Sequence, residues 1–184
     1  MQAGLDLLGT CLDFNQSIFS CINKSMVKYD RLKAIEYAYN FWNKRNPRFY
    51  NFDKIGGDCT NFISQCLFYG GIEMSFSKNG WYYSSLNNRA PAWTGVDEFY
   101  DFLITNTSKF GVKGKLIDLS QVEVGDVIQM DQRRGYFHHN LIVTSIGKKK
   151  NPQNIFIACH SADAFNKRLA DYNYSRLRVI KILN

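Results

Sequence analysis

Cys59 directly follows Gly56-Gly57-Asp58, and the apolar spacing after it predicts a helix that begins at this cysteine. Unpaired amides and the positive end of the helix dipole at such a position stabilise a thiolate and lower the pKa of the thiol. The same amides can donate to the oxyanion that forms when a thiolate attacks a carbonyl carbon. The position therefore predicts a nucleophile for acyl transfer, and a buried structural cysteine is the alternative.

The base that such a nucleophile needs must come from the later part of the chain. The sequence contains three histidines, His138, His139 and His160, and all lie in a segment rich in strand-forming residues. Adjacent residues of a strand point to opposite faces, so only one of His138 and His139 can face the cysteine. The pattern does not choose between them, and a surface imidazole without a role is the alternative for either.

A second polar group could fix the tautomer and orientation of the base histidine. His160 ends a strand that can form a hairpin with the strand following His139, so it is one candidate. Asp163, which carries a full charge, is its rival. Asp58, next to the cysteine, is a further candidate for an orienting or oxyanion-binding role. The alternative for His160 and Asp163 is a polar turn over residues 161–166.

Aromatic side chains on either side of Cys59 in the sequence are candidates for contacts with a substrate. Tyr50 could supply a second oxyanion donor beside the amide of Cys59. Residues 72–95 are rich in Ser, Asn, Trp and Tyr and are predicted as a long loop of the kind that builds substrate clefts. Trp81 in this loop is predicted to stack on sugar or peptide rings. Packing is the alternative for Tyr50 and Trp81, and it is favoured for Trp93.

Three helices are expected in the first part of the chain. Apolar residues recur every three or four positions from Asp30 to shortly before Pro47, which predicts an amphipathic helix. A second helix begins after Asp58, a candidate N-cap, and ends at Gly70. A third is predicted over residues 95–106.

The last part of the chain changes to short β-rich runs separated by turn residues. Strands are predicted at residues 125–130, 140–145, 155–160 and 177–182. Helices followed by antiparallel strands give an α+β architecture. Residues 29–184 are therefore expected to form one domain, with N-terminal helices packed on a C-terminal antiparallel sheet.

The composition limits the possible classes of protein. The 184 residues are 45% hydrophobic and 21% charged, which excludes a disordered chain and favours one globular domain. The net charge of +7 predicts attraction to polyanions. Basic residues cluster only in the predicted turns at 133–134 and 148–150. A cell-wall polymer or a membrane surface accounts for the charge as well as DNA does, and no nucleic-acid partner is expected.

The cysteines predict neither a disulfide framework nor a metal site. Their number is odd, their spacing lacks CxxC, and at least one thiol is free. The five are Cys11, Cys21, Cys59, Cys66 and Cys159. No cofactor is expected.

No apolar run reaches the roughly 20 residues that a membrane span needs, and the start of the chain lacks the basic region of a secretory signal. Residues 1–28 are predicted to be a helical extension or the end of a preceding segment.

Four ordered motifs resemble those of the amidase domain found in many clostridial and bacillar proteins, and more distantly those of the NlpC/P60 and CHAP superfamily. They are GGDCTNFISQ at residues 56–65, VGDVI at 124–128, HNLIVT at 139–144 and HSAD at 160–163. The first is long and specific, whereas the others persuade mainly through their order and spacing. The resemblance covers nearly the whole chain apart from its first 28 residues.

The resemblance implies a papain-like fold of the NlpC/P60 type, in which a nucleophilic cysteine opens a helix that packs against an antiparallel sheet carrying a histidine. By position, Cys59 matches the nucleophile, His139 the base, and His160 the residue that orients the base. The chain departs from the pattern of the superfamily by placing about twenty residues between these two histidines, more than a tight hairpin needs. Whether His160 or Asp163 is the third catalytic residue therefore stays open.

Members of this superfamily mostly cleave amide bonds in peptidoglycan peptides. The resemblance thus implies a cysteine-dependent hydrolase that cleaves an amide of peptidoglycan or a related peptide through a thioester, in the cell wall or outside the cell. Two other classes remain open. The same Cys-His pair could serve an acyltransferase or a toxin-type modifying enzyme, and the domain could be a non-catalytic cell-wall-binding module.

Overall fold

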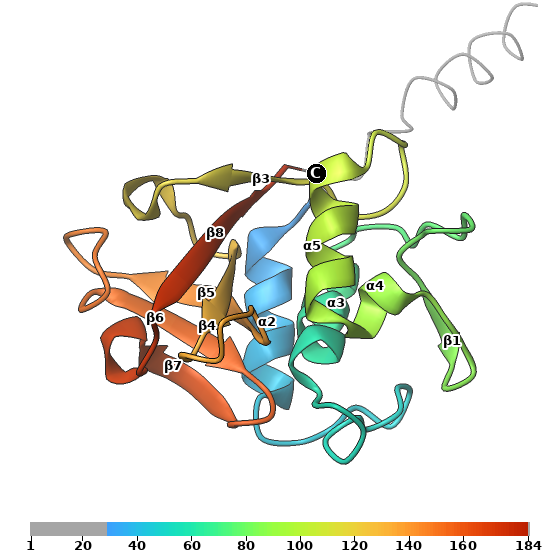
Figure 1. Cartoon of the computed structure of the whole chain (residues 1–184), viewed down its shortest axis with the longest axis horizontal. Coiled ribbons are helices and arrows are strands. Elements are labelled where there is room, and N and C mark those ends of the chain that lie inside the picture. The colour runs from blue at the N-terminus through green and yellow to red at the C-terminus, as the bar shows by residue number, and fades with distance from the viewer. Residues whose placement is uncertain (1–28, 184) are drawn as a thin grey trace, which may run out of the picture.

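The computed structural model describes residues 29–183 and has an α+β architecture. Helices from the first half of this range lie against an antiparallel sheet formed mainly by the second half (Figure 1). Within residues 29–183, every helix is too short or too polar to cross a membrane. The predicted extension over residues 1–28, together with Cys11 and Cys21, lies outside the described residues, and its role stays a prediction.

The three predicted helices are present. α2 (Arg31–Phe41) begins after Asp30, whose side chain caps the first turn. α3 (Cys59–Tyr69) is buried through most of its length and runs through the main core. α5 (Val96–Thr105) follows the short α4 (Pro91–Thr94) and buries a single apolar stripe. Because α3 is enclosed on nearly all sides, the surrounding core fixes where its first residue lies.

One six-stranded antiparallel sheet forms the second layer, in the order β3-β8-β4-β5-β6-β7. The strands are β3 (Gly114–Ile117), β4 (Val127–Asp131), β5 (His139–Ile146), β6 (Ile155–Cys159), β7 (Ala164–Arg168) and β8 (Arg176–Ile182). The four inner strands are the predicted ones. The edge strands β3 and β7 are not predicted from the sequence, because they are short and mostly exposed and so carry little apolar patterning.

Apolar side chains cover both faces of the sheet. Val127 and Ile142 belong to the main core on the helix side. Ile128 and Leu141 belong to a second core, which the 3-10 turn Leu169–Asp171 helps to close. Neighbouring residues of β5 therefore lie in different surroundings, which matters for the two adjacent histidines at its start.

A partly buried ion pair joins α2 to the sheet. Arg31 Nη1 lies 2.7 Å from Asp126 Oδ1, and Arg31 Nη2 donates to the carbonyl of Ile182 at 2.9 Å. The carboxylate of Asp126 also accepts from the amides of Glu123 at 2.8 Å and Ile182 at 3.0 Å. A buried carboxylate is tolerated when it is paired and hydrogen-bonded in this way. The motif at residues 124–128 thus has a structural role, because its Asp126 joins α2 to the sheet.

The segment over residues 72–95 is not the long loop that the sequence predicts. Ser75 and Trp81 form an isolated β-bridge, and β1 (Tyr83–Ser85) pairs with β2 (Asn88–Arg89) in a small hairpin. The helix α4 then follows directly. These strands are too short for an alternating pattern to be visible in the sequence.

Trp81 is buried, so the prediction that it contacts a substrate is wrong. Its side chain is 0% exposed, its ring lies 4.8 Å from that of Trp93, and its Nε1 donates to Ser64 Oγ at 3.0 Å. Trp93 is buried too, as the packing interpretation predicts, and its Nε1 donates to Asn61 Oδ1 at 2.9 Å. Each indole fills the core and satisfies its N–H on α3.

Replacing Trp81 by alanine is expected to lower the free energy of unfolding by about 3–5 kcal/mol, because the change leaves a cavity. Urea unfolding followed by circular dichroism measures the difference. Phe76→Ala is the matched control, since this ring is 67% exposed, and its effect should stay within about 0.5 kcal/mol. A Trp81→Ala protein as stable as the parent would contradict the packing role.

Candidate active site

Cys59 lies at the start of α3, against the start of β5. Its thiol points to the carbonyl oxygen of His138 at 3.9 Å, and the amide of Asn140 donates to its sulfur. These contacts lie on either side of His139 in the chain, so the sulfur lies against the main chain of that residue. The structure therefore brings the candidate nucleophile and the two adjacent histidines into one region.

The carboxylate of Asp58 does not cap α3, although Asp58 occupies the N-cap position. Its Oδ1 accepts from the amide of Phe52 and from Asn61 Nδ2, each at 2.9 Å. Its Oδ2 lies 2.5 Å from His160 Nδ1. Because this carboxylate is engaged elsewhere, the first-turn amides of α3 remain without a side-chain cap and can serve an oxyanion.

Cys59 is only 5% exposed, and burial raises the pKa of its thiol. Hydrogen bonds from the amides of Asn140 and Thr60 act in the opposite sense. The sequence-based expectation of a lowered pKa is therefore wrong for the protein without substrate. The reason is that the loss of solvent around the sulfur outweighs the donors at the helix start.

His139 is a buried histidine with an unsatisfied ring nitrogen. Its side chain is 6% exposed, and Nε2 is one of two buried side-chain polar atoms that lack a hydrogen-bond partner within residues 29–183. Burial, assisted by the neighbouring His138, lowers the pKa of the ring to about 4. The ring is therefore neutral near pH 7 and able to accept a proton. A buried nitrogen left unpaired costs about 1–3 kcal/mol, and a functional role would explain why it persists.

His138 has a different environment. Its ring lines the same cavity as Cys59, but Nδ1 lies 3.2 Å from the carbonyl of Tyr136 and Nε2 lies 3.2 Å from Gln132 Oε1. Strand alternation places His138 on the helix side of β5 and His139 on the opposite side. No hydrogen bond joins the Cys59 sulfur to either ring in the described part of the chain. The geometry thus leaves two candidate bases, of which only His139 has an unengaged buried nitrogen.

His160 does not hydrogen-bond to His139, which corrects the prediction that it orients this ring. Its Nδ1 is paired with Asp58, and its Nε2 lies 2.8 Å from the carbonyl oxygen of Phe41. Its ring stacks on Phe62 with 3.9 Å between centroids. Because both nitrogens are engaged, His160 has no group left with which to orient His139. Instead it joins the ends of α2 and β6 to the start of α3.

Asp163 and Tyr50, the other predicted candidates, also lie apart from the histidine. Asp163 accepts two hydrogen bonds from Arg45, at 3.0 and 2.9 Å, at the protein surface. Tyr50 is 41% exposed, and its amide donates to the hydroxyl of Tyr83 at 2.9 Å. Neither residue lines the cavity at Cys59. The structure therefore gives Asp163 a place in a surface ion pair and Tyr50 a place in a loop contact.

The loop before α3 is held in one shape by a network of charges. Arg45 binds Asp53 and Asp163 and lies 3.6 Å from Asp58 Oδ2. Gly57 adopts a φ of 105°, a conformation that favours glycine, and a side chain there would meet Ser161. These contacts fix the approach of the chain to Cys59.

A cavity of about 700 Å³ opens beside Cys59. Phe52 and the loop before α3 form one wall, and the start of α5 and the segment before β5 form the others. Arg89, Arg134 and Glu98 bring charge into it. From the sequence, Arg134 belongs only to a basic turn, and Arg89 and Glu98 are not singled out, because an isolated charged residue in a loop carries no pattern. Within residues 29–183, no three His, Cys, Asp or Glu side chains are grouped to hold a metal ion.

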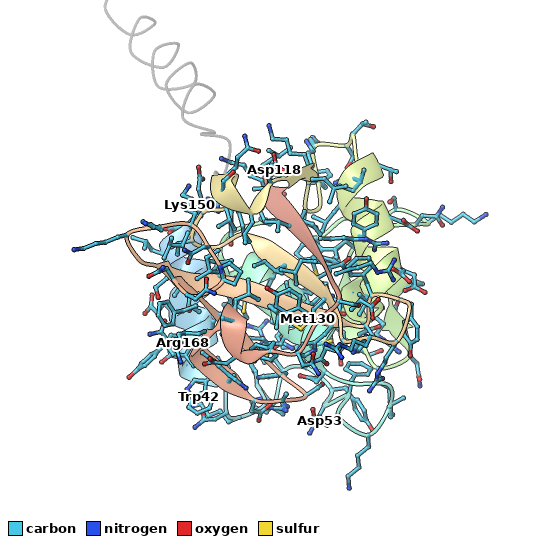
Figure 2. All side chains as sticks on the ribbon, turned by 60° about the vertical axis from the view of Figure 1, so that its left-hand side comes forward. Trp42, Asp53, Asp118, Met130, Lys150 and Arg168 are labelled. Carbon is cyan, nitrogen blue, oxygen red and sulfur yellow. The ribbon has the colours of Figure 1, made fainter. Side chains whose placement is uncertain are left out.

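The basic turn at residues 148–150 lies away from this site. All three lysines are exposed. Figure 2 shows Lys150 at one end of the molecule and Asp53, which belongs to the loop before α3, at the other. The cluster is therefore a solvated turn and does not contribute charge at the cavity.

Asp58→Asn is expected to destabilise the protein by about 1–3 kcal/mol, because the amide group cannot accept at both of its ends and leaves a buried donor of Phe52, Asn61 or His160 unpaired. The midpoint of urea unfolding measures the loss. Asp171→Asn is the control, since Asp171 pairs with Arg168 at the surface, and such pairs contribute about 1 kcal/mol or less. Equal stability of the two variants would show that the Asp58–His160 pair does not hold the helix start.

The buried His139 ring predicts a loss of stability in acid. Between about pH 6.5, its ordinary pKa, and about pH 4, its pKa in the fold, the unfolded chain takes up a proton that the folded chain does not. Stability from this group is therefore complete above about pH 6.5 and falls by roughly 3 kcal/mol as the pH drops to about 4. His139→Gln should lack this component when unfolding free energies are compared across that range. Identical pH profiles would contradict it.

Curated proteins of Bacillus subtilis are similar to the chain. The uncharacterised protein YhbB is 34% identical over 152 residues, covering 80% of this chain and 45% of YhbB. The uncharacterised protein YjcM is 28% identical over 153 residues, covering 77% of this chain and 33% of YjcM. The chain thus spans less than half the length of these relatives. No solved structure matches it.

The family comparison covers almost all of the described domain. A family model described as "Putative amidase domain" matches residues 28–182, which include the loop before α3, the start of β5 and the end of β6. The family description indicates a hydrolase of amide bonds. The chain belongs to this amidase domain family.

Proposed function

We propose that this protein is a cysteine-dependent amide hydrolase, with Cys59 as nucleophile and His139 as base. The observation that supports it most is the position of the sulfur at the uncapped start of α3, against the main chain of His139 and in the wall of a cavity. The unengaged, neutral ring of His139 supports its role as base. The helix-opening cysteine and the histidine at the start of an antiparallel strand also support a papain-like relationship.

The proposed reaction begins from a neutral thiol and a neutral imidazole. Cys59 passes its proton to His139 as the sulfur attacks the amide carbonyl, and the amide of Cys59 donates to the resulting oxyanion. The C–N bond then breaks, His139 returns the proton to the leaving amine, and a thioester remains. Water, deprotonated by His139, hydrolyses the thioester and restores the thiol. The two side chains are not hydrogen-bonded in the absence of substrate, and the ring of His139 lies on the face of β5 away from α3. The ring must therefore turn around the start of the strand toward Cys59 before it can take the proton.

His160 takes a positioning role in this proposal. Through Asp58 it holds the start of α3, and through the carbonyl of Phe41 it holds the end of α2. It acts on the position of the sulfur and not on the imidazole of His139. This assignment accounts for a histidine in the motif at residues 160–163 without a contact to the base.

The proposed substrate is an amide of peptidoglycan or a related cell-wall peptide. Stem peptides carry free carboxylates, and Arg89 and Arg134 offer guanidinium donors in a cavity wall that also contains Asp97 and Glu98. The net charge of +7 also favours approach to an anionic polymer. The proposed place of action is the cell wall.

Cys59→Ala and His139→Ala should each reduce turnover to the background rate, whereas His138→Ala should retain measurable hydrolysis. The assay follows newly formed amino groups and released peptides after incubation with purified peptidoglycan. Cys66→Ala is the matched control, because this cysteine is fully buried in the same helix and is not part of the cavity wall. It should stay active.

Unfolding curves for each variant separate loss of chemistry from loss of fold. Activity in the Cys59→Ala protein would end the proposal for the nucleophile. A dead His138→Ala protein beside an active His139→Ala protein would move the role of base to His138.

A further inference from the structure

Arg89 is an arginine whose side chain is held in place without an acidic partner. Its Nε donates to Thr94 Oγ1 at 3.3 Å, and its Nη1 donates to the carbonyl of Leu86. Its Cζ lies 4.7 Å from the ring centroid of Phe52. Contacts from three segments of the chain therefore fix the plane of the guanidinium.

The other arginines that are fixed by several contacts bind carboxylates. These are Arg31, Arg45, Arg176 and Arg178. Within residues 29–183, Arg89 has no carboxylate within ion-pair distance, although it is partly buried. A guanidinium is always charged and offers five N–H donors in a rigid plane. The contacts to Thr94 and Leu86 use two of these donors and leave the rest available.

Arg89 lines the same cavity as Cys59. Phe52, over whose ring it lies, also borders this cavity and belongs to the loop before α3. A substrate that presents its amide to the sulfur would therefore occupy a cavity whose wall also carries the guanidinium.

We infer that Arg89 binds a free carboxylate of the substrate, close to the amide that is cleaved. The inference deepens the proposed function and rests on it. The substrate class is a peptide amide with a carboxylate next to the scissile bond, and the corresponding carboxamide is a poor substrate. A planar pair of N–H donors matches the two oxygens of a carboxylate, which neither a lysine nor a carboxamide reproduces.

The charged side chains around the cavity show why selection of a carboxylate depends on the fixed N–H donors of Arg89. Arg134 adds a positive charge, whereas Glu98 and Asp97 bring negative charges to the wall at the start of α5. Asp97 is bound by Arg178 at 3.1 Å, but Glu98 is exposed. Because the cavity wall carries both positive and negative side chains, its overall electrostatic field attracts anions only weakly. Selection of a carboxylate requires a fixed donor pair such as the one that Arg89 offers.

The test compares two forms of one substrate on several variants. Peptides released from purified peptidoglycan are used either with their carboxylates free or after conversion of these to carboxamides. The parent protein should cleave the free form with a kcat/KM roughly 10- to 100-fold higher, as expected for a charge-assisted hydrogen bond. Arg89→Gln should lose this preference mainly through KM, and Arg89→Lys should recover only part of it. Arg168→Gln, at the surface, should keep it.

Binding to the Cys59→Ala protein provides a readout that does not depend on turnover. Calorimetry should show that Cys59→Ala prefers the free form and that Cys59→Ala with Arg89→Gln does not. Equal binding of both forms by Cys59→Ala, or a preference unchanged by Arg89→Gln in a protein that unfolds normally, would overturn the inference. Hydrolysis by Cys59→Ala would overturn the proposed nucleophile instead, and the binding comparison would still decide the role of Arg89.

Discussion

The pairing of His160 with Asp58 is the interaction on which the arrangement of this site depends. Both side chains are 1% exposed and their polar atoms lie 2.5 Å apart. The pair joins the end of β6 to the start of α3, and the second nitrogen of His160 reaches the end of α2. Two helices and the sheet therefore meet at one residue. Because Asp58 is occupied there, it cannot cap α3, and the helix start is left open beside Cys59.

Burial shifts the pKa values of the proposed nucleophile and the proposed base in opposite directions. It raises the pKa of the Cys59 thiol and lowers that of His139 to about 4. Both changes favour the uncharged forms, so the site at rest holds a thiol and an imidazole in place of an ion pair. In the proposed mechanism, charge forms only when the proton moves from sulfur to imidazole during attack. Such a site keeps its sulfur less reactive toward small electrophiles in solution.

The sequence predicts the helices and inner strands well, because their apolar periodicity is long enough to be visible. It also predicts that Cys59 opens a helix beside the strand of His139. It fails for Trp81, since a tryptophan in a polar segment has no local signal of burial. It fails for the partner of His160, because strand pairing predicts proximity to β5 but not that the ring turns toward Asp58. Arg89 escapes notice for a similar reason, as its role depends on contacts that come together only in the fold.

The junction made by Arg31 has a consequence for the architecture of longer proteins. Through its hydrogen bond to the carbonyl of Ile182, it holds the first helix of the domain next to the end of the last strand. Arg31 at the start of α2 and Ile182 at the end of β8 are therefore neighbours in the fold, although they lie near the two borders of the family match in the sequence. A module whose ends are adjacent can be joined to, or inserted into, another polypeptide without disturbing its own core. This property suits a domain that makes up less than half of relatives such as YhbB.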